Sequence, residues 1–153
     1  MSSRQLDKVL AILARQKAED GTASFDESRG LMAERCARWS VPIGQQQGIA
    51  HPLATAHVEV EVSRLATMQA AELYDAGDPG VAEAANIAKY VGAEAALNSL
   101  DQSIQTHGGN GLAHEYGLSE LWFVTRLMRT APVSREMVLN FIAQTSLGLP
   151  RSY

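Results

Sequence analysis

Cysteine, aromatic residues and long apolar runs are scarce in this chain. Its 153 residues include a single cysteine, Cys36, and only 6% are aromatic. One cysteine excludes a disulfide within the chain and a cysteine-rich metal site. No stretch approaches the roughly 20 consecutive apolar residues of a membrane-spanning helix, and charged residues interrupt the first 19 residues where a secretory signal would need an apolar core. We therefore expect no membrane association and a reduced, cytoplasmic setting.

Positively charged residues are also fewer than negatively charged ones. Lysine and arginine together number 13 against 17 aspartate and glutamate residues, which gives a net charge of −4. Without a basic run, nucleic-acid binding through the phosphate backbone is disfavoured. Apolar residues make up 46% of the chain and charged residues 20%, a composition typical of a globular rather than a disordered protein. The length fits one domain that can bury a real core.

Apolar residues at helical spacing begin close to the N-terminus. They predict an amphipathic helix over about residues 4–19. Gly21–Ser24 interrupts this pattern, and Asp26 can cap a second helix that runs to about residue 38. We expect residues 1–25 to form a helical segment of their own and residues 26–153 to form the main domain.

Two long helices form the centre of the prediction. The first covers about residues 47–76, and its apolar line consists of Val58, Val62, Leu65, Met68 and Leu73. Gly77–Gly80 is a compact stop-and-turn sequence. The second helix covers about residues 81–106 and is rich in alanine, the best helix former. Because the connection is so short, the two helices should be antiparallel neighbours.

Two shorter helices complete the set. They are predicted over about residues 119–129 and 134–147, the latter capped by Ser134. Val58–Val62 alternates like a strand, but its alanine-rich flanks with helical spacing favour a helix. The predicted fold is therefore all-α, an up-and-down helical bundle of four main helices with short flanking helices.

The most informative short motif follows the second long helix, at Gln105-Thr106-His107-Gly108-Gly109-Asn110-Gly111. Glycines allow backbone conformations closed to other residues and let a flat or anionic ligand approach the main chain. A simple helix C-cap and turn would explain the same glycines. If Gly109 has a positive φ, a valine at this position should strain the loop.

The remaining candidate residues give little support for a metal site or for aromatic ligand contacts. The four histidines are too scattered for a zinc site and form neither a His-Glu-x-x-His nor a Glu-x-x-His motif, so no metal site is predicted. Trp39 and Trp122 are interpreted as packing anchors.

Taken together, several segments resemble the acyl-CoA dehydrogenase family. In chain order they are Pro42–Ala54, similar to P-I-x-x-x-Q-x-I-x-x-x-L-A; Ala88-Lys89; Ile104–Gly111, similar to Q-x-x-G-G-x-G; Glu115-Tyr116; and Arg126. Each match alone is weak, but their order and spacing over about residues 30–147 are specific. The chain is identified as similar to the C-terminal helical-bundle domain of this family.

The resemblance implies a flavoprotein oxidoreductase of fatty acid metabolism. Members bind FAD and oxidise an acyl-CoA to its 2,3-enoyl form, and their C-terminal bundles associate in dimers or tetramers. Gln105, Gly108 and Gly109 match positions that contact the adenosine-diphosphate half of an FAD bound mainly by a neighbouring subunit. The resemblance thus implies a homo-oligomer, or a heteromer with a fuller acyl-CoA dehydrogenase subunit that supplies the acyl-CoA site.

The sequence departs from the family at the catalytic base. Members usually have Tyr-Glu-Gly-Thr where this chain has Ala131-Pro132-Val133-Ser134. Pro132 stands at the usual glutamate position and cannot take a proton, so no catalytic residue is assigned. Glu136 lies one helical turn further on and is interpreted as a first-turn acid favoured by the helix dipole.

Two further departures concern the flavin and the rest of the enzyme. The family's Arg-x-x-Phe-Gly, whose arginine reaches the FAD pyrophosphate, is replaced here by Cys36–Ser40, and Arg35 or Arg38 could substitute. The family's N-terminal and middle domains have no counterpart in these residues. The resemblance therefore implies that this chain does not build a full active site alone.

Two functions stay open at this point. The chain could be the C-terminal part or subunit of an acyl-CoA dehydrogenase, or a non-catalytic degenerate bundle that associates with partners but has lost flavin. Pro132 and Cys36 favour the second, whereas the intact Gln105–Gly111 motif favours the first. The ordered motifs and the acidic charge disfavour an unrelated ligand-binding or DNA-binding helical protein.

Overall fold

The computed structural model describes residues 43–151, and all regular secondary structure in this range is helical. A short 3-10 turn, η1 (Ile43–Gln45), leads into α3 (Gln47–Asp75), which is followed by α4 (Val81–His107). The 3-10 segments η2 (Gly108–Leu112) and η3 (His114–Tyr116) then lead to α5 (Leu118–Leu127) and α6 (Arg135–Thr145). The predicted four main helices are confirmed. The helices predicted before residue 40, the boundary at residue 25, and Trp39 lie outside the described residues.

The turn between α3 and α4 forms where the sequence predicts it. Gly77 has a φ of 65°, a left-handed conformation that glycine adopts without steric cost. The side chain of Asp78 accepts a hydrogen bond of 2.7 Å from the backbone N–H of Gly80. The chain reverses within these few residues, and α4 packs along α3 in the most extensive helix–helix contact of the described part.

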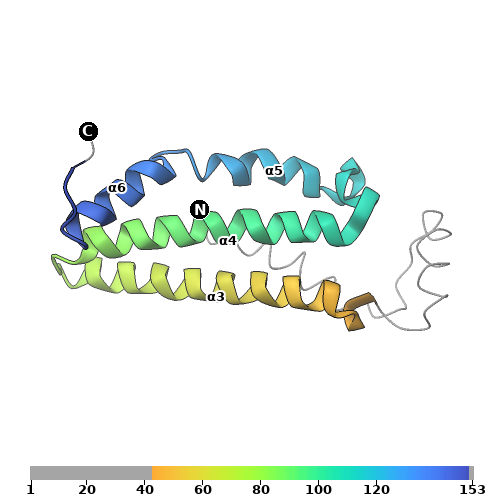
Figure 1. Ribbon diagram of the computed structural model, residues 1–153, viewed down its shortest axis with the longest axis horizontal. Coiled ribbons are helices and arrows are strands. Elements are labelled where there is room, and N and C mark those ends of the chain that lie inside the picture. Colours follow the sequence, from red (N-terminus) through yellow and green to blue (C-terminus); the bar gives the residue numbers. More distant parts are fainter. Residues whose placement is uncertain (1–42, 152–153) are drawn as a thin grey trace.

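The described helices form three layers with α4 in the middle (Figure 1). α3 covers one side of α4, and α5 and α6 lie end to end along its other side. The side chains between the layers are mostly small. The buried apolar residues are Ala56, Val60, Ala84, Ala93, Ala95, Ala96, Leu100, Leu118 and Val138. Small side chains let the helices approach closely, but they give the domain a thin core.

The apolar line predicted for α3 does not form this core. Its members Val58, Val62, Leu65 and Met68 are 58%, 52%, 66% and 54% exposed. The residues of α3 that are buried are instead Ala56, Val60 and Ser63. Since one residue advances about 100° around a helix, positions two residues apart lie on nearly opposite sides. The large apolar side chains therefore face away from α4, and we call these four residues the α3 outer face.

The aromatic and apolar side chains of α5 show the same trend. Trp122, predicted as a packing anchor, is 45% exposed, and Phe123 is 71% exposed. The prediction for Trp122 is wrong within the described residues, because only one side of the short α5 contacts α4. Within residues 43–151, no helix combines the length and apolarity that crossing a membrane would need.

Candidate cofactor site at the end of α4

The end of α4 is shaped by two glycines with different constraints. Gly108 has a φ of 58° and donates its backbone N–H to the carbonyl oxygen of Gln105. Gly111 is buried, and a Cβ atom there would lie 2.5 Å from the carbonyl oxygen of Ile104. The loop therefore turns sharply and packs its bare backbone against the last turn of α4. Helix capping explains Gly108, as the simple turn interpretation of the motif predicts, and close packing on Ile104 explains Gly111.

Gly109 differs from both of its neighbours in the motif. The positive φ considered for it belongs to Gly108 instead, and a Cβ atom on Gly109 would meet nothing within 4 Å. Neither its backbone conformation nor its packing within this chain requires glycine. The described residues therefore do not explain a glycine at this position.

Three of the residues predicted to contact the cofactor lie together at this end of α4. Gln105, Gly108 and Gly109 are all exposed, and Gly108 and Gly109 present bare backbone to open space. Such backbone can approach a pyrophosphate closely, and an amide side chain can bond a phosphate or ribose oxygen. The group thus fits the adenosine-diphosphate half of FAD. The other two predicted residues, Arg35 and Arg38, lie outside the described residues.

His107 and Tyr116 complete the loop, and sequence reasoning missed their contact. His107 Nδ1 lies 2.8 Å from the carbonyl oxygen of Ser103, one helical turn earlier. The rings of His107 and Tyr116 meet edge to face, with centroids 5.7 Å apart and planes at 65°. The four-residue spacing from Ser103 to His107 was visible in the sequence, but the fold of η3 onto α4 was not.

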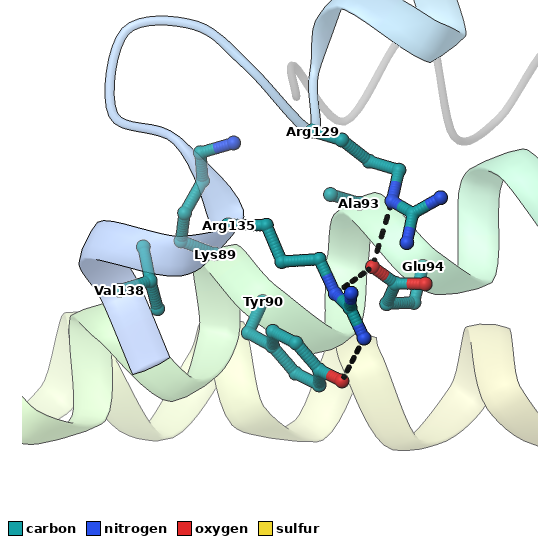
Figure 2. A pocket seen from close by; sticks show the side chains of 7 residues that line it. All are labelled: Lys89, Tyr90, Ala93, Glu94, Arg129, Arg135 and Val138. Carbon is teal, nitrogen blue, oxygen red and sulfur yellow. Dashed lines mark hydrogen bonds and ion pairs between the residues drawn. The ribbon is translucent and has the colours of Figure 1, made fainter. Parts of the chain in front are cut away.

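A second polar cluster lies where α5 ends and α6 begins (Figure 2). Glu94 Oε1 lies 2.9 Å from Arg129 Nε and 3.0 Å from Arg135 Nε, so one carboxylate of α4 pairs with both ends of the intervening loop. Arg135 also donates to the hydroxyl of Tyr90 at 3.3 Å and lies over its ring. We call these residues the Glu94 cluster.

Lys89 reinforces the same junction from α4. Its ammonium group donates to the carbonyl oxygen of Met128, and partial burial lowers the pKa of the lysine below its usual value. The hollow that these side chains line with Ala93 and Val138 contains about 170 Å³ of space, including open solvent. Glu94 pairs with both arginines and the Lys89 ammonium bonds a backbone carbonyl, so each charged group has a protein partner and we interpret the cluster as a structural junction.

Pro132 lies on the exposed loop that the Glu94 cluster anchors. Glu136 occupies the first turn of α6, where the Ser134 side chain accepts a hydrogen bond of 3.3 Å from the backbone N–H of Met137. This confirms the predicted cap. Among residues 43–151, no three His, Cys, Asp or Glu side chains gather closely enough to hold a metal ion.

Comparison with known proteins decides the family. The model of the acyl-CoA dehydrogenase C-terminal domain matches residues 11–147. The chain belongs to the acyl-CoA dehydrogenase family. The family resemblance drawn from the sequence motifs is thereby confirmed, and the match also includes residues before position 30.

Two relatives show how much of an acyl-CoA dehydrogenase the chain represents. Acyl-CoA dehydrogenase FadE12 of Mycobacterium tuberculosis is 62% identical over 116 residues, which are 75% of this chain and 30% of the relative. YngJ of Bacillus subtilis, named for the same activity, is 33% identical over 125 residues, or 82% of this chain and 32% of the relative. The chain thus spans about a third of the length of these relatives.

Solved structures support the fold. The FAD complex of PigA superposes with a TM-score of 0.76 at 20% identity, covering 95% of this chain and 34% of PigA. A candidate acyl-CoA dehydrogenase from Mycobacterium abscessus superposes with a TM-score of 0.73 at 25% identity, covering 94% of this chain and 32% of that protein. The all-α fold of an acyl-CoA dehydrogenase C-terminal domain is therefore confirmed.

Proposed function

We propose that this chain is the C-terminal domain or subunit of an FAD-dependent acyl-CoA dehydrogenase that converts an acyl-CoA to its 2,3-enoyl form. In this role it contacts the adenosine-diphosphate half of an FAD shared across a subunit interface. The exposed group of Gln105, Gly108 and Gly109 carries the proposal. Gly109 supports it most directly, because nothing in the described residues explains a glycine there.

The catalytic base comes from elsewhere under this proposal. The α5–α6 loop has proline at position 132, where the family motif has glutamate, and proline has no group that can accept the α-proton. Glu136 is held in the first turn of α6, beyond the loop. The chain therefore contributes binding and assembly, and other residues of the assembled enzyme perform the proton abstraction.

The α3 outer face supports association with a second subunit. Val58, Val62, Leu65 and Met68 each expose more than half of their surface along one side of a single long helix. A row of exposed large apolar side chains is typical of an interaction surface. We propose that the partner is another copy of this chain or a fuller acyl-CoA dehydrogenase subunit, which holds the acyl-CoA.

The cytoplasmic location expected from the sequence also stays a prediction.

A flavin titration tests the proposed function. FAD is added to the chain alone and to the chain assembled with the remaining dehydrogenase domains, and binding is followed by flavin absorbance and fluorescence. Gln105→Ala should weaken binding about fivefold, the effect of one lost hydrogen bond. Gln144→Ala, at a partly exposed glutamine of α6, is the matched control and should leave the affinity unchanged.

The competing function is a non-catalytic bundle that associates with partners without flavin. The specific observation in its favour is Pro132 at the position of the family's base. Absence of saturable FAD binding in both the isolated chain and the assembly would select this alternative and reject the proposed cofactor role.

A further inference from the structure

We propose that His107 is a positioning residue that holds the Gly108–Leu112 loop in the shape in which Gly108 and Gly109 face the cofactor. The proposal rests on the proposed function. His107 lies between Gln105 and Gly108, and its side chain is partly buried. It contacts Ser103 on α4 and Tyr116 on η3, which stand before and after the loop in the sequence.

The chemistry of the Ser103 contact fixes the hydrogen on the imidazole. A backbone carbonyl oxygen can only accept a hydrogen bond, so the His107 Nδ1 atom at 2.8 Å must be the donor. Neutral His107 is therefore the Nδ1–H tautomer, and its ring plane is set by the last turn of α4. Because the orientation of the ring is fixed in this way, the ring can hold its edge-to-face contact with Tyr116 in one geometry.

The contacts of His107 with Ser103 and Tyr116 connect the segments that precede and follow the loop. Gly108 has no side chain to hold its unusual conformation, with φ at 58° and ψ at −136°, and nothing lies near its missing Cβ or that of Gly109. Their conformation is therefore held by backbone hydrogen bonds within and beside η2, such as the one from the Gly108 N–H to the Gln105 carbonyl oxygen, and by the residues on either side of them. Gly111 is fixed by its packing on Ile104, and we infer that His107 fixes the other side. Without the contacts of His107, we expect the loop to adopt several conformations, and a ligand would have to select one of them.

The test separates the two contacts of His107 by substitution. His107→Asn keeps an N–H donor near the place of Nδ1 but loses the ring, His107→Phe keeps a ring for Tyr116 but loses the donor, and His107→Ala loses both. His114→Ala is the matched control, because the His114 side chain is 86% exposed and, among the side chains that the structure describes, pairs only with the exposed Glu120.

Three measurements are made on the full chain and its variants. Nitrogen-15 NMR of the wild type should show that the neutral imidazole of His107 is the Nδ1–H tautomer. Amide hydrogen exchange over residues 108–116 should accelerate about fivefold in His107→Ala, the effect of one lost hydrogen bond, while His107→Asn and His107→Phe fall between it and the wild type. The dissociation constant for FAD should rise by a similar factor in His107→Ala and be partly restored in His107→Asn.

Each outcome decides one claim. An Nε2–H tautomer, or exchange in His107→Ala equal to that in His114→Ala, overturns the role of His107. Unchanged FAD affinity in a His107→Ala chain whose loop exchanges faster overturns it too, since loop shape would then not matter for the cofactor. Absence of FAD binding by the wild-type chain, both alone and assembled with the remaining dehydrogenase domains, rejects the proposed function instead, and the tautomer and exchange results still decide whether His107 holds the loop.

Discussion

Gly111 and Gly109 lie two residues apart but differ in how much space surrounds their Cα atoms. A Cβ atom on Gly111 would lie 2.5 Å from the carbonyl oxygen of Ile104, whereas one on Gly109 would meet nothing within 4 Å. Gly111→Ala should therefore lower the free energy of unfolding by about 1–3 kcal/mol, because the loop must move off α4. Gly109→Ala should change it by less than about 0.5 kcal/mol. Urea denaturation followed by circular dichroism compares the two, and equal midpoints would contradict the close packing at Gly111.

Ser99 is a buried hydroxyl whose contribution should be unfavourable. Its side chain is fully buried, and Oγ has no hydrogen-bond partner among residues 43–151. Ser99→Ala removes this unsatisfied group and adds the best helix former, so we expect the free energy of unfolding to rise by roughly 1 kcal/mol.

Ser103→Ala is the control for Ser99, since Ser103 is equally buried but donates to the Ser99 carbonyl oxygen at 2.8 Å. It should be neutral or destabilising by about 0.5–1.5 kcal/mol. Thermal melts of both variants give the comparison, and a Ser99→Ala protein that melts below the Ser103→Ala protein would show that the Ser99 hydroxyl is satisfied.

At the residue scale, the sequence located the turn after α4 but not the task of each residue in it. The run from Gln105 to Gly111 predicted a turn with ligand-accessible backbone, and the turn is there. Which glycine has the positive φ and which one packs on Ile104 depends on how the loop folds back. The roles of Gly108 and Gly111 therefore could not be read from their order, and neither could the contact of His107 with Tyr116.

At the scale of the helix, the predicted ends were accurate and the predicted buried side of α3 was not. The turn at Gly77–Gly80 and the cap at Ser134 are local signals that need no tertiary information. The side of α3 that faces α4 is lined by small residues such as Ala56 and Ser63. A search for large apolar residues therefore selects the α3 outer face, because hydrophobicity does not say which partner covers it.

The Glu94 cluster decides how α5 and α6 are held on α4. Glu94→Gln would leave Arg129 and Arg135 facing a neutral side chain, although each donor can still find the amide oxygen or water. We expect a loss of about 1–2 kcal/mol in the free energy of unfolding, well below the cost of breaking a fully buried pair, because the side chain of Glu94 is 34% exposed.

Glu61→Gln is the control for this ion-pair effect. Glu61 pairs with Arg64 at 3.8 Å on the surface of α3, and such pairs contribute at most about 0.5 kcal/mol. Guanidinium would screen the very charges under test, so the two variants are compared by urea denaturation at low salt. If Glu94→Gln and Glu61→Gln have the same effect, the cluster does not anchor the junction.

At the scale of the molecule, the three-layer arrangement leaves two broad faces. α4 packs against α3 on one side and against α5 and α6 on the other, while α3 shares no extensive contact with α5 or α6. The described helices therefore do not close around a common core as a free-standing four-helix bundle does. The large apolar residues of α3 lie outside, and they need a covering surface that residues 43–151 do not supply.

Association through the α3 outer face gives the last prediction. Leu65 is 66% exposed near the middle of α3, so Leu65→Glu would place a charge in the proposed contact without disturbing the packing on α4. We expect this variant to shift the sedimentation equilibrium toward the monomer, with a dissociation constant at least tenfold higher for roughly 1.4 kcal/mol of lost association energy. Gln69→Glu adds the same charge one turn further along the same side of α3, also at an exposed position, and tests whether a charge beside the apolar side chains is enough to separate the subunits. Dissociation by Leu65→Glu but not by Gln69→Glu would place the interface on the apolar line itself. An unchanged oligomer in both would move the interface to another part of the chain, and a wild-type chain that sediments as a monomer would require a different partner for this face.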